Sequence, residues 1–172
     1  MDSRVTFVIH IVAIVLAGAA IAVPASAQSR ERIVQTEEIG GALPFEIPSM
    51  TMKGVVHPAA GRRLYIVTLA LGEEAIEMDV NKFPLVTDGG THEPIGAGAG
   101  ENLIVPLDRV PVDQEVGQIL PSDAIVSLTR RGSGVTIEAG PRGTIALLYE
   151  LPATSSVRAL KLPDGRELRI SR

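Results

Sequence analysis

Two runs of the chain are apolar at almost every position and predict the central strands of a β-sheet. Leu64 to Leu71 is rich in β-branched residues and places apolar side chains on both faces of an extended chain. Thr144 to Leu151 has the same character, and Pro152 ends it because proline has no N–H to donate to a neighbouring strand. We expect these two runs to form the core of the fold.

Shorter stretches that alternate apolar and polar residues surround these runs. They lie at Phe45 to Ile47, Phe83 to Leu85, Ile125 to Arg130, Val135 to Glu138, Leu160 to Leu162 and Leu168 to Ile170. Two tight turns, Arg131 to Gly134 and Leu162 to Arg166, join four of them into hairpins. About seven to nine short strands at this spacing predict an all-β fold, a sandwich or barrel of antiparallel sheets, over residues 45–172.

Three segments lack a strong strand pattern. Residues 28–44 begin polar and charged and contain Gly40-Gly41, so we interpret them as a flexible leader, with an edge strand starting at Ile33-Val34 as the alternative. Residues 89–121 indicate mainly loop, with a short strand at Leu103 to Val105 as the alternative within it, and the alternating glycines and alanines of residues 96–100 favour a flexible loop. Gly72 to Asp79 resembles a single helical turn.

The N-terminus has the three-part layout of a secretory signal peptide. Arg4 precedes an apolar run from Val5 to Val23, and Ala25-Ser26-Ala27 supplies small residues for a signal peptidase. Residues 1–27 are therefore predicted to be a signal peptide, and its removal leaves 172 − 27 = 145 residues in the periplasm or outside the cell. The alternative is a retained membrane anchor, since about 18 apolar residues can just span a bilayer.

Composition excludes several classes of protein. The 172 residues are 45% apolar, 21% charged and 3% aromatic, which suits one modest domain. The formal net charge of −4 gives no overall positive field to hold a phosphate backbone, so nucleic acid is not an expected partner. The absence of cysteine excludes a disulfide framework, a thiol nucleophile and a zinc–thiolate cluster.

The residues suited to site chemistry are few. After residue 27 the chain has two histidines, His57 and His92, which with a carboxylate such as Asp88 or Glu93 would suit zinc or copper. Neither histidine has the spacing that places two ligands on one element, so we treat them as weak candidates for a metal site. No serine lies in a G-x-S-x-G turn and no phosphate-binding loop is present. We expect no catalytic residues and no cofactor.

Four segments together resemble a known family. They are Gly61 to Leu71, Phe83 to Gly90, Gly140 to Pro152 and Leu160 to Leu162. This pattern is similar to that of the telokin-like immunoglobulin-fold domains of exported bacterial proteins. It consists of a glycine before an aromatic-aliphatic strand, a phenylalanine-led strand with an Asp-Gly turn, and a strand that closes in Glu-Leu-Pro. Those domains include the mycobacterial immunoprotective extracellular protein and a family of unknown function. His92 stands where the family often has an aromatic residue, and no lipoprotein cysteine is present.

The resemblance implies an immunoglobulin-like β-sandwich and a binding or interaction module, and it supplies no catalytic residues. Our hypothesis is therefore an exported, non-enzymatic binding module whose partner is an unknown protein or small ligand. Contact would be made through loops at one end of the sandwich or through an exposed strand edge. The alternatives are a periplasmic metal-binding protein using His57 and His92, and a membrane-tethered subunit that keeps its apolar N-terminus.

Overall fold

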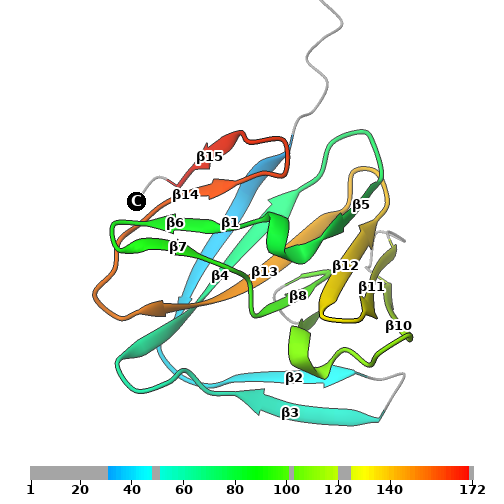
Figure 1. Ribbon diagram of the computed structural model, residues 1–172, viewed down its shortest axis with the longest axis horizontal. Helices are drawn as coiled ribbons and strands as arrows, with labels where there is room; N and C mark the ends of the chain where they lie inside the picture. The colour runs from blue at the N-terminus through cyan, green and yellow to red at the C-terminus, as the bar shows by residue number, and fades with distance from the viewer. Residues whose placement is uncertain (1–30, 48–50, 101–102, 120–124, 171–172) are drawn as a thin grey trace, which may run out of the picture.

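Antiparallel β-sheet makes up most of the chain in the computed structural model, which describes residues 31–47, 51–100, 103–119 and 125–170 (Figure 1). The prediction of an all-β fold is confirmed. These residues form fifteen strands, more than the seven to nine expected, because several strands are only three residues long. The predicted signal peptide, residues 1–27, lies outside the described residues.

The largest sheet has five strands in the order β1-β4-β13-β8-β9. Their bounds are Arg32–Ile39 for β1, Arg62–Ala70 for β4, Thr144–Pro152 for β13, Gly96–Gly98 for β8 and Ile104–Pro106 for β9. The two strands expected to be central, β4 and β13, are neighbours and pair with Tyr65 opposite Tyr149. Pairing on both sides of each strand satisfies its backbone groups, so both strands tolerate complete burial.

Three smaller sheets surround this one. The first, in the order β10-β11-β12-β5, has strands Glu115–Ile119, Ile125–Arg131, Gly134–Ala139 and Ile76–Asp79. The second, in the order β15-β14-β6-β7, has strands Glu167–Arg169, Val157–Lys161, Leu85–Thr87 and Gly90–His92. The third is a hairpin of β2, Leu43–Ile47, and β3, Met52–Val56. Two short 3₁₀ helices, η2 (Val80–Lys82) and η4 (Leu107–Arg109), follow β5 and β9.

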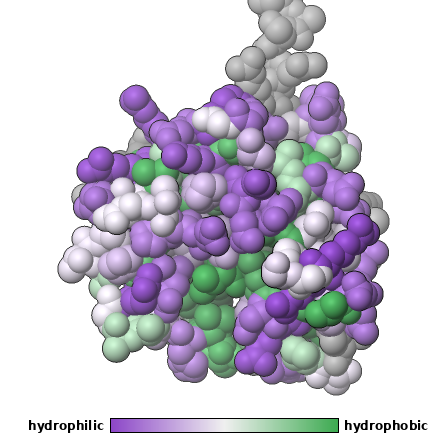
Figure 2. Space-filling view, in the orientation of Figure 1, coloured by the Kyte–Doolittle hydropathy of each residue, from purple (hydrophilic) through white to green (hydrophobic). Residues whose placement is uncertain are grey.

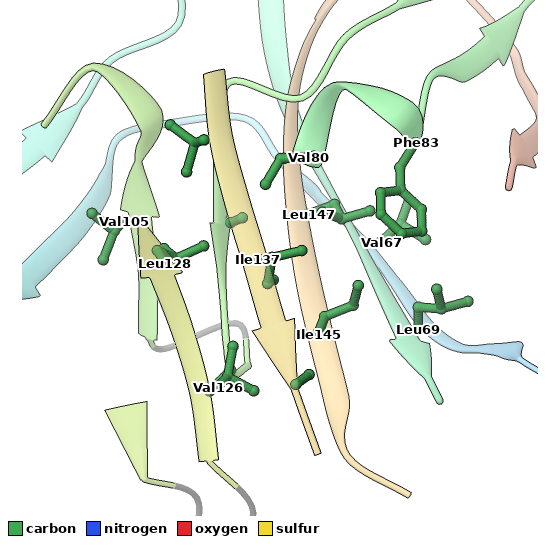
Figure 3. Close-up of a cluster of buried hydrophobic side chains, with 14 of the residues drawn as sticks. Val67, Leu69, Val80, Phe83, Val105, Val126, Leu128, Ile137, Ile145 and Leu147 are labelled. Carbon is green, nitrogen blue, oxygen red and sulfur yellow. The ribbon is translucent and has the colours of Figure 1, made fainter. Parts of the chain in front are cut away.

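Both faces of the five-stranded sheet are covered. On one face, Val67, Leu69, Ile145 and Leu147 meet side chains from β11 and β12 in a single cluster (Figure 3). Leu85 of β6 and Leu160 of β14 belong to the same cluster. The opposite face carries a second cluster that contains Leu64, Ile66, Ala146, Leu148 and Ile104, with Leu43 and Val56 of the β2–β3 hairpin packed against it. Burial on both faces explains why β4 and β13 are apolar at nearly every position.

The two predicted hairpins are present. β11 pairs with β12 around Gly132, which has a φ of +62°, and β14 pairs with β15 around Gly165, which has a φ of +86°. A left-handed backbone costs an L-residue free energy that glycine does not lose, so both turns fall where the sequence places glycine. The segment that resembles a helical turn, Gly72 to Asp79, instead ends in β5, which pairs with β12.

The interpretation of residues 28–44 as a flexible leader is wrong for the part that the structure describes. β1 pairs with β4 along its whole length, from Arg32 opposite Ala70 to Ile39 opposite Leu64, and β2 begins at Leu43. The alternative of an edge strand near Ile33-Val34 is the one that holds. β1 lies at the sheet edge and most of its side chains are exposed, so it lacks the apolar pattern on which strand prediction depends.

The expectation of a flexible Gly-Ala loop is also wrong. Gly96–Gly98 is strand β8, which lies between β13 and β9, and all three of its residues are buried. A Cβ placed at Gly98 would lie 2.0 Å from the carbonyl oxygen of Leu103. Small residues are needed here because the neighbouring backbone approaches too closely for a side chain.

An ionic cluster joins the start of β1 to the last hairpin. Arg166 Nη2 lies 2.6 Å from Glu31 Oε2, and Arg166 Nε pairs with Asp164. Hydrogen bonding from Arg166 lowers the pKa of Glu31, and the Glu31 carboxylate in turn raises the pKa of Arg166. The cluster therefore ties together two segments that are 135 positions apart in the chain.

Candidate functional site

His57 and His92 lie in different parts of the fold. His57 follows β3 and is exposed, whereas His92 ends β7, is partly buried and places Nε2 3.2 Å from Thr87 Oγ1. Asp88, one of the carboxylates suggested to complete a metal site, accepts a hydrogen bond of 2.9 Å from Ser156 N. That hydrogen bond lowers the Asp88 pKa. In the ranges that the structure describes, no three His, Asp or Glu residues are grouped closely enough to hold a metal ion.

A polar hollow lies beside the edge strand β1. It has a volume of about 490 Å³ and is lined by Thr36, Glu38, Arg63, Tyr65, residues 153–157 and Ile170. We call it the Arg63 groove. Its two sides come from the β1–β4 pair and from the segment that leads from β13 into β14. Ligand sites commonly have volumes of about 300–1,000 Å³, so the groove is large enough for a small ligand or a short segment of a partner.

The pairing of β1 with β4 explains why polar side chains line the groove. Thr36 stands opposite Val67 and Glu38 opposite Tyr65, so Thr36 and Glu38 share the face of the sheet that carries the main core. Arg63 alternates with Tyr65 and falls on that same face. Polar residues at these inward positions mark the place where the core opens to the surface along β1.

Arg63 is the central residue of the groove, and its side chain is only 15% exposed. Its Nη1 lies 2.5 Å from Glu38 Oε2, and its Nη2 donates a 2.7 Å hydrogen bond to the carbonyl oxygen of Ser155. The Nε atom is buried and has no hydrogen-bond partner among the described residues. An unsatisfied buried N–H costs about 1–3 kcal/mol, and the Nε atom of Arg130 is buried without a partner in the same way.

The wall formed by residues 153–157 is held by its own hydrogen bonds. The amide and the hydroxyl of Ser155 both donate to the carbonyl oxygen of Pro152, at 3.0 and 2.8 Å. The neighbouring Ser156 amide donates to Asp88. Thr154, between these anchored residues, is exposed at the rim of the groove. These contacts fix the carbonyl oxygen that orients Arg63, so the groove is formed before any ligand arrives.

A second hollow is apolar. It has a volume of about 470 Å³ and lies between the β2–β3 hairpin and η4, lined by Phe45, Val55, Val56, Ile95 and residues 106–109. Figure 2 shows hydrophobic residues gathered on this face above the hairpin. Asp108 and Arg109 at its rim pair with each other at 3.5 Å, which leaves the hollow without a directed polar group. It therefore provides apolar area without the polar contacts that orient a ligand.

The described residues thus define an all-β protein with a polar groove beside β1 that includes the partly buried Arg63. Comparison with protein-family models, with curated proteins and with solved structures found no match for this chain. Among the described residues, no helix is long and apolar enough to span a membrane.

Sequence reasoning did not identify the Arg63 groove, although one signal was available. In the run that begins at Arg62, alternate positions from Tyr65 onward are apolar and face the core, and Arg63 falls on that same alternation. An arginine at an inward position of a central strand needs a partner. Its partners, Glu38 and Ser155, are distant in the sequence, so only the fold reveals them.

Proposed function

We propose that this chain is an exported, non-enzymatic binding module and that the Arg63 groove is its ligand site. The observation that carries the proposal is the polar hollow of about 490 Å³ beside β1, in which Glu38 and the carbonyl oxygen of Ser155 hold Arg63 in place. A preformed groove of this volume with polar side chains in its lining is suited to recognition of a small polar ligand.

The chemistry of the lining favours binding over catalysis. The Glu38 carboxylate is engaged in an ion pair with Arg63 Nη1. The Ser155 hydroxyl donates to a main-chain carbonyl, whereas a nucleophilic serine needs a base to accept that proton. The groove lining contains no histidine. These arrangements support recognition of a ligand without bond breaking.

We propose the immunoglobulin-like sandwich as the finer description of the fold. Its support is that the segments resembling telokin-like domains supply β4, β6, β13 and β14, which contribute to one shared core. Gly61, the glycine before the first of these strands, has a φ of +75°, a conformation that favours glycine. The main sheet faces two smaller sheets across that core, as sheets do in a sandwich.

Export rests on the signal-like N-terminus, and the place of action is proposed to be the periplasm or the outside of the cell. Mass spectrometry of the protein recovered after export tests this part of the proposal. We expect a mass that begins at Gln28. A mass that still includes Met1 would instead support the membrane-tethered alternative.

A fragment screen tests the binding site. The ¹⁵N-labelled exported protein is titrated with a panel of small amides, alcohols and organic acids, and the backbone amide signals are followed by NMR. We expect at least one fragment to shift the signals of Thr36, Thr154 and Ser156, and Arg63→Lys to weaken that response. Arg142→Lys is the matched control, because Arg142 is an exposed arginine paired with Glu73 away from the groove. Shifts confined to other surfaces would refute the assignment of the site.

A further inference from the structure

We infer that this chain forms a two-fold symmetric dimer through β15, the edge strand Glu167–Arg169, so that the four-stranded sheets of two copies join into one continuous sheet. β15 ends the strand order β15-β14-β6-β7 and lies at the outside of the molecule (Figure 1). None of its residues lines the Arg63 groove, so β15 is a surface separate from the proposed ligand site. Its open backbone groups, its charges and its apolar centre all fit a second copy of this chain.

The outward side of β15 carries main-chain groups that no described strand pairs with. The amide of Ile170 donates a 2.9 Å hydrogen bond to the carbonyl oxygen of Arg158, so Ile170 turns its main-chain groups toward β14. Successive residues of a strand point these groups to opposite sides, so those of Leu168 also face β14, whereas those of Glu167 and Arg169 face away. Glu167 and Arg169 therefore offer N–H donors and C=O acceptors to a further strand.

The charges of β15 are complementary to those of its own copy. When two β15 strands pair antiparallel about a two-fold axis at Leu168, Glu167 of each copy lies opposite Arg169 of the other. These are also the residues whose main-chain groups face outward, so the same register lets them exchange hydrogen bonds. Both side chains are exposed, and Arg169 has no ion-pair partner among the described residues. Each half of the symmetric contact therefore gains an ion pair together with reciprocal main-chain hydrogen bonds.

Leu168 provides an apolar contact on the two-fold axis. Its side chain packs against the main core and is only partly buried there. The two Leu168 residues would form a pair that exchanges no main-chain hydrogen bonds, in which opposite Cα atoms lie about 4.5 Å apart. Side chains at such a pair touch, so dimerisation covers the part of Leu168 that the single chain leaves exposed.

Other sheet edges fit a second copy less well. β1 contains a register shift, and β9 ends at Pro106, which has no N–H to donate. β5 carries Glu77 and Asp79, so a symmetric pair about Met78 would place acidic side chains opposite each other. Of these four edge strands, β15 is the one that is regular, free of proline and complementary in charge to itself.

Sedimentation equilibrium of the exported protein, from about 10 µM to about 1 mM, tests for this dimer. We expect a reversible rise from the monomer mass toward the dimer mass. Arg169→Glu places glutamates opposite each other, and Glu167→Lys does the same with positive charges, so each should weaken dimerisation about tenfold or more. An equimolar mixture of the two variants should restore the dimer, because opposite charges then face each other at both pairs. Arg142→Glu is the matched control, because it makes the same change in net charge at an exposed arginine outside β15.

Amide hydrogen exchange of the unchanged protein locates the contact without any substitution, so it decides the matter even if a variant fails to fold. The amides of Glu167 and Arg169 should exchange more slowly as the protein concentration rises, because they donate to the second copy. The amide of Thr154, an exposed residue at the groove rim, should exchange at a constant rate. A protein that stays monomeric to about 1 mM, a dimer that Arg169→Glu leaves intact, or exchange at Glu167 and Arg169 that does not depend on concentration would overturn the inference.

Discussion

The hydroxyl of Tyr149 donates a 2.7 Å hydrogen bond to the main-chain carbonyl oxygen of Phe83, and both residues are buried. Tyr149 lies in β13, and Phe83 lies in the segment between η2 and β6, so the bond joins the main sheet to a neighbouring one. Burial also raises the Tyr149 pKa well above 10. Burial therefore favours the neutral hydroxyl, which is the form that donates this hydrogen bond.

Replacing Tyr149 by phenylalanine should lower the free energy of unfolding by about 1–2 kcal/mol, because the buried carbonyl of Phe83 loses its donor. Urea unfolding at pH 7 measures the change. Tyr65→Phe is the matched control, since Tyr65 stands opposite Tyr149 in the sheet and lines the open Arg63 groove. Equal losses in the two variants would contradict a specific role for the Tyr149–Phe83 bond.

In the unchanged protein, the stability contributed by Tyr149 is complete below about pH 10 and is lost as the pH rises further, because only the unfolded phenol ionises there.

Gly98 should tolerate no side chain. A Cβ at this position would lie 2.0 Å from Leu103 O and 2.7 Å from the Leu103 carbonyl carbon, and backbone atoms cannot move aside as the end of a side chain can. We expect Gly98→Ala to cost about 3 kcal/mol or more, or to prevent folding. Gly100→Ala is the control, because nothing lies within 4 Å of a Cβ there. Thermal unfolding of both variants gives the comparison, and a Gly98→Ala protein as stable as Gly100→Ala would disprove the packing of β8.

The contrast between β8 and β4 shows which parts of the fold the sequence can predict. β4 and β13 are predictable because strands that are buried on both faces consist of consecutive β-branched and aliphatic residues, a pattern visible in the local sequence. The hairpins at Gly132 and Gly165 are predictable because a positive φ selects glycine within the turn itself. The sequence of β8 shows no such local pattern. Its Gly98 is required by the backbone of Leu103 and Ile104, and that close approach exists only after the chain has folded.

The Arg63 groove could not be predicted from the sequence for a related reason. Glu38 and Thr36 are polar residues on an edge strand, where exposed polar side chains are ordinary, so they indicated a leader rather than a wall of a groove. Arg63 belongs to a segment that the sequence does single out, but its chemistry depends on Ser155, 92 positions away. A single sequence can mark an inward arginine as unusual without revealing which groups surround it.

The Glu31–Arg166 contact should make stability depend on acid pH. Because Arg166 lowers the Glu31 pKa below its usual value of 4.5, the folded state holds the ionised carboxylate more firmly than the unfolded state does. The resulting stability is fully present above about pH 4.5 and is lost as the pH falls through the lowered pKa. The contact is partly exposed, so we expect Glu31→Gln to cost no more than about 1 kcal/mol at pH 7.

Urea unfolding of Glu31→Gln and of the unchanged protein at pH 7 and pH 3 tests whether the stability contributed by Glu31 decreases as the pH falls. The difference between the two proteins should be smaller at pH 3 than at pH 7, because the unfolded state takes up a proton on Glu31 over this range more readily than the folded state does. Glu93→Gln is the control, since Glu93 is an exposed carboxylate on a different part of the surface. A difference that stays the same at both pH values would show that Glu31 acts through packing rather than through its charge.

Strand β1, which the sequence pattern alone assigns to a leader, should be needed for the stability of the fold. β1 hydrogen-bonds along nearly all of β4, and Ile33 and Ile39 pack against the two apolar clusters. The strand also contains a register shift between Ile33 and Gln35, an irregularity that discourages pairing with another sheet edge.

A chain that begins at Leu43 would lose these contacts and expose the edge of β4, which is apolar on both faces. We expect it to unfold at a lower temperature than a chain that begins at Glu31, or to aggregate, as measured by circular dichroism and light scattering. If the two chains had the same stability and remained monomeric, β1 would be dispensable and the leader interpretation would be restored.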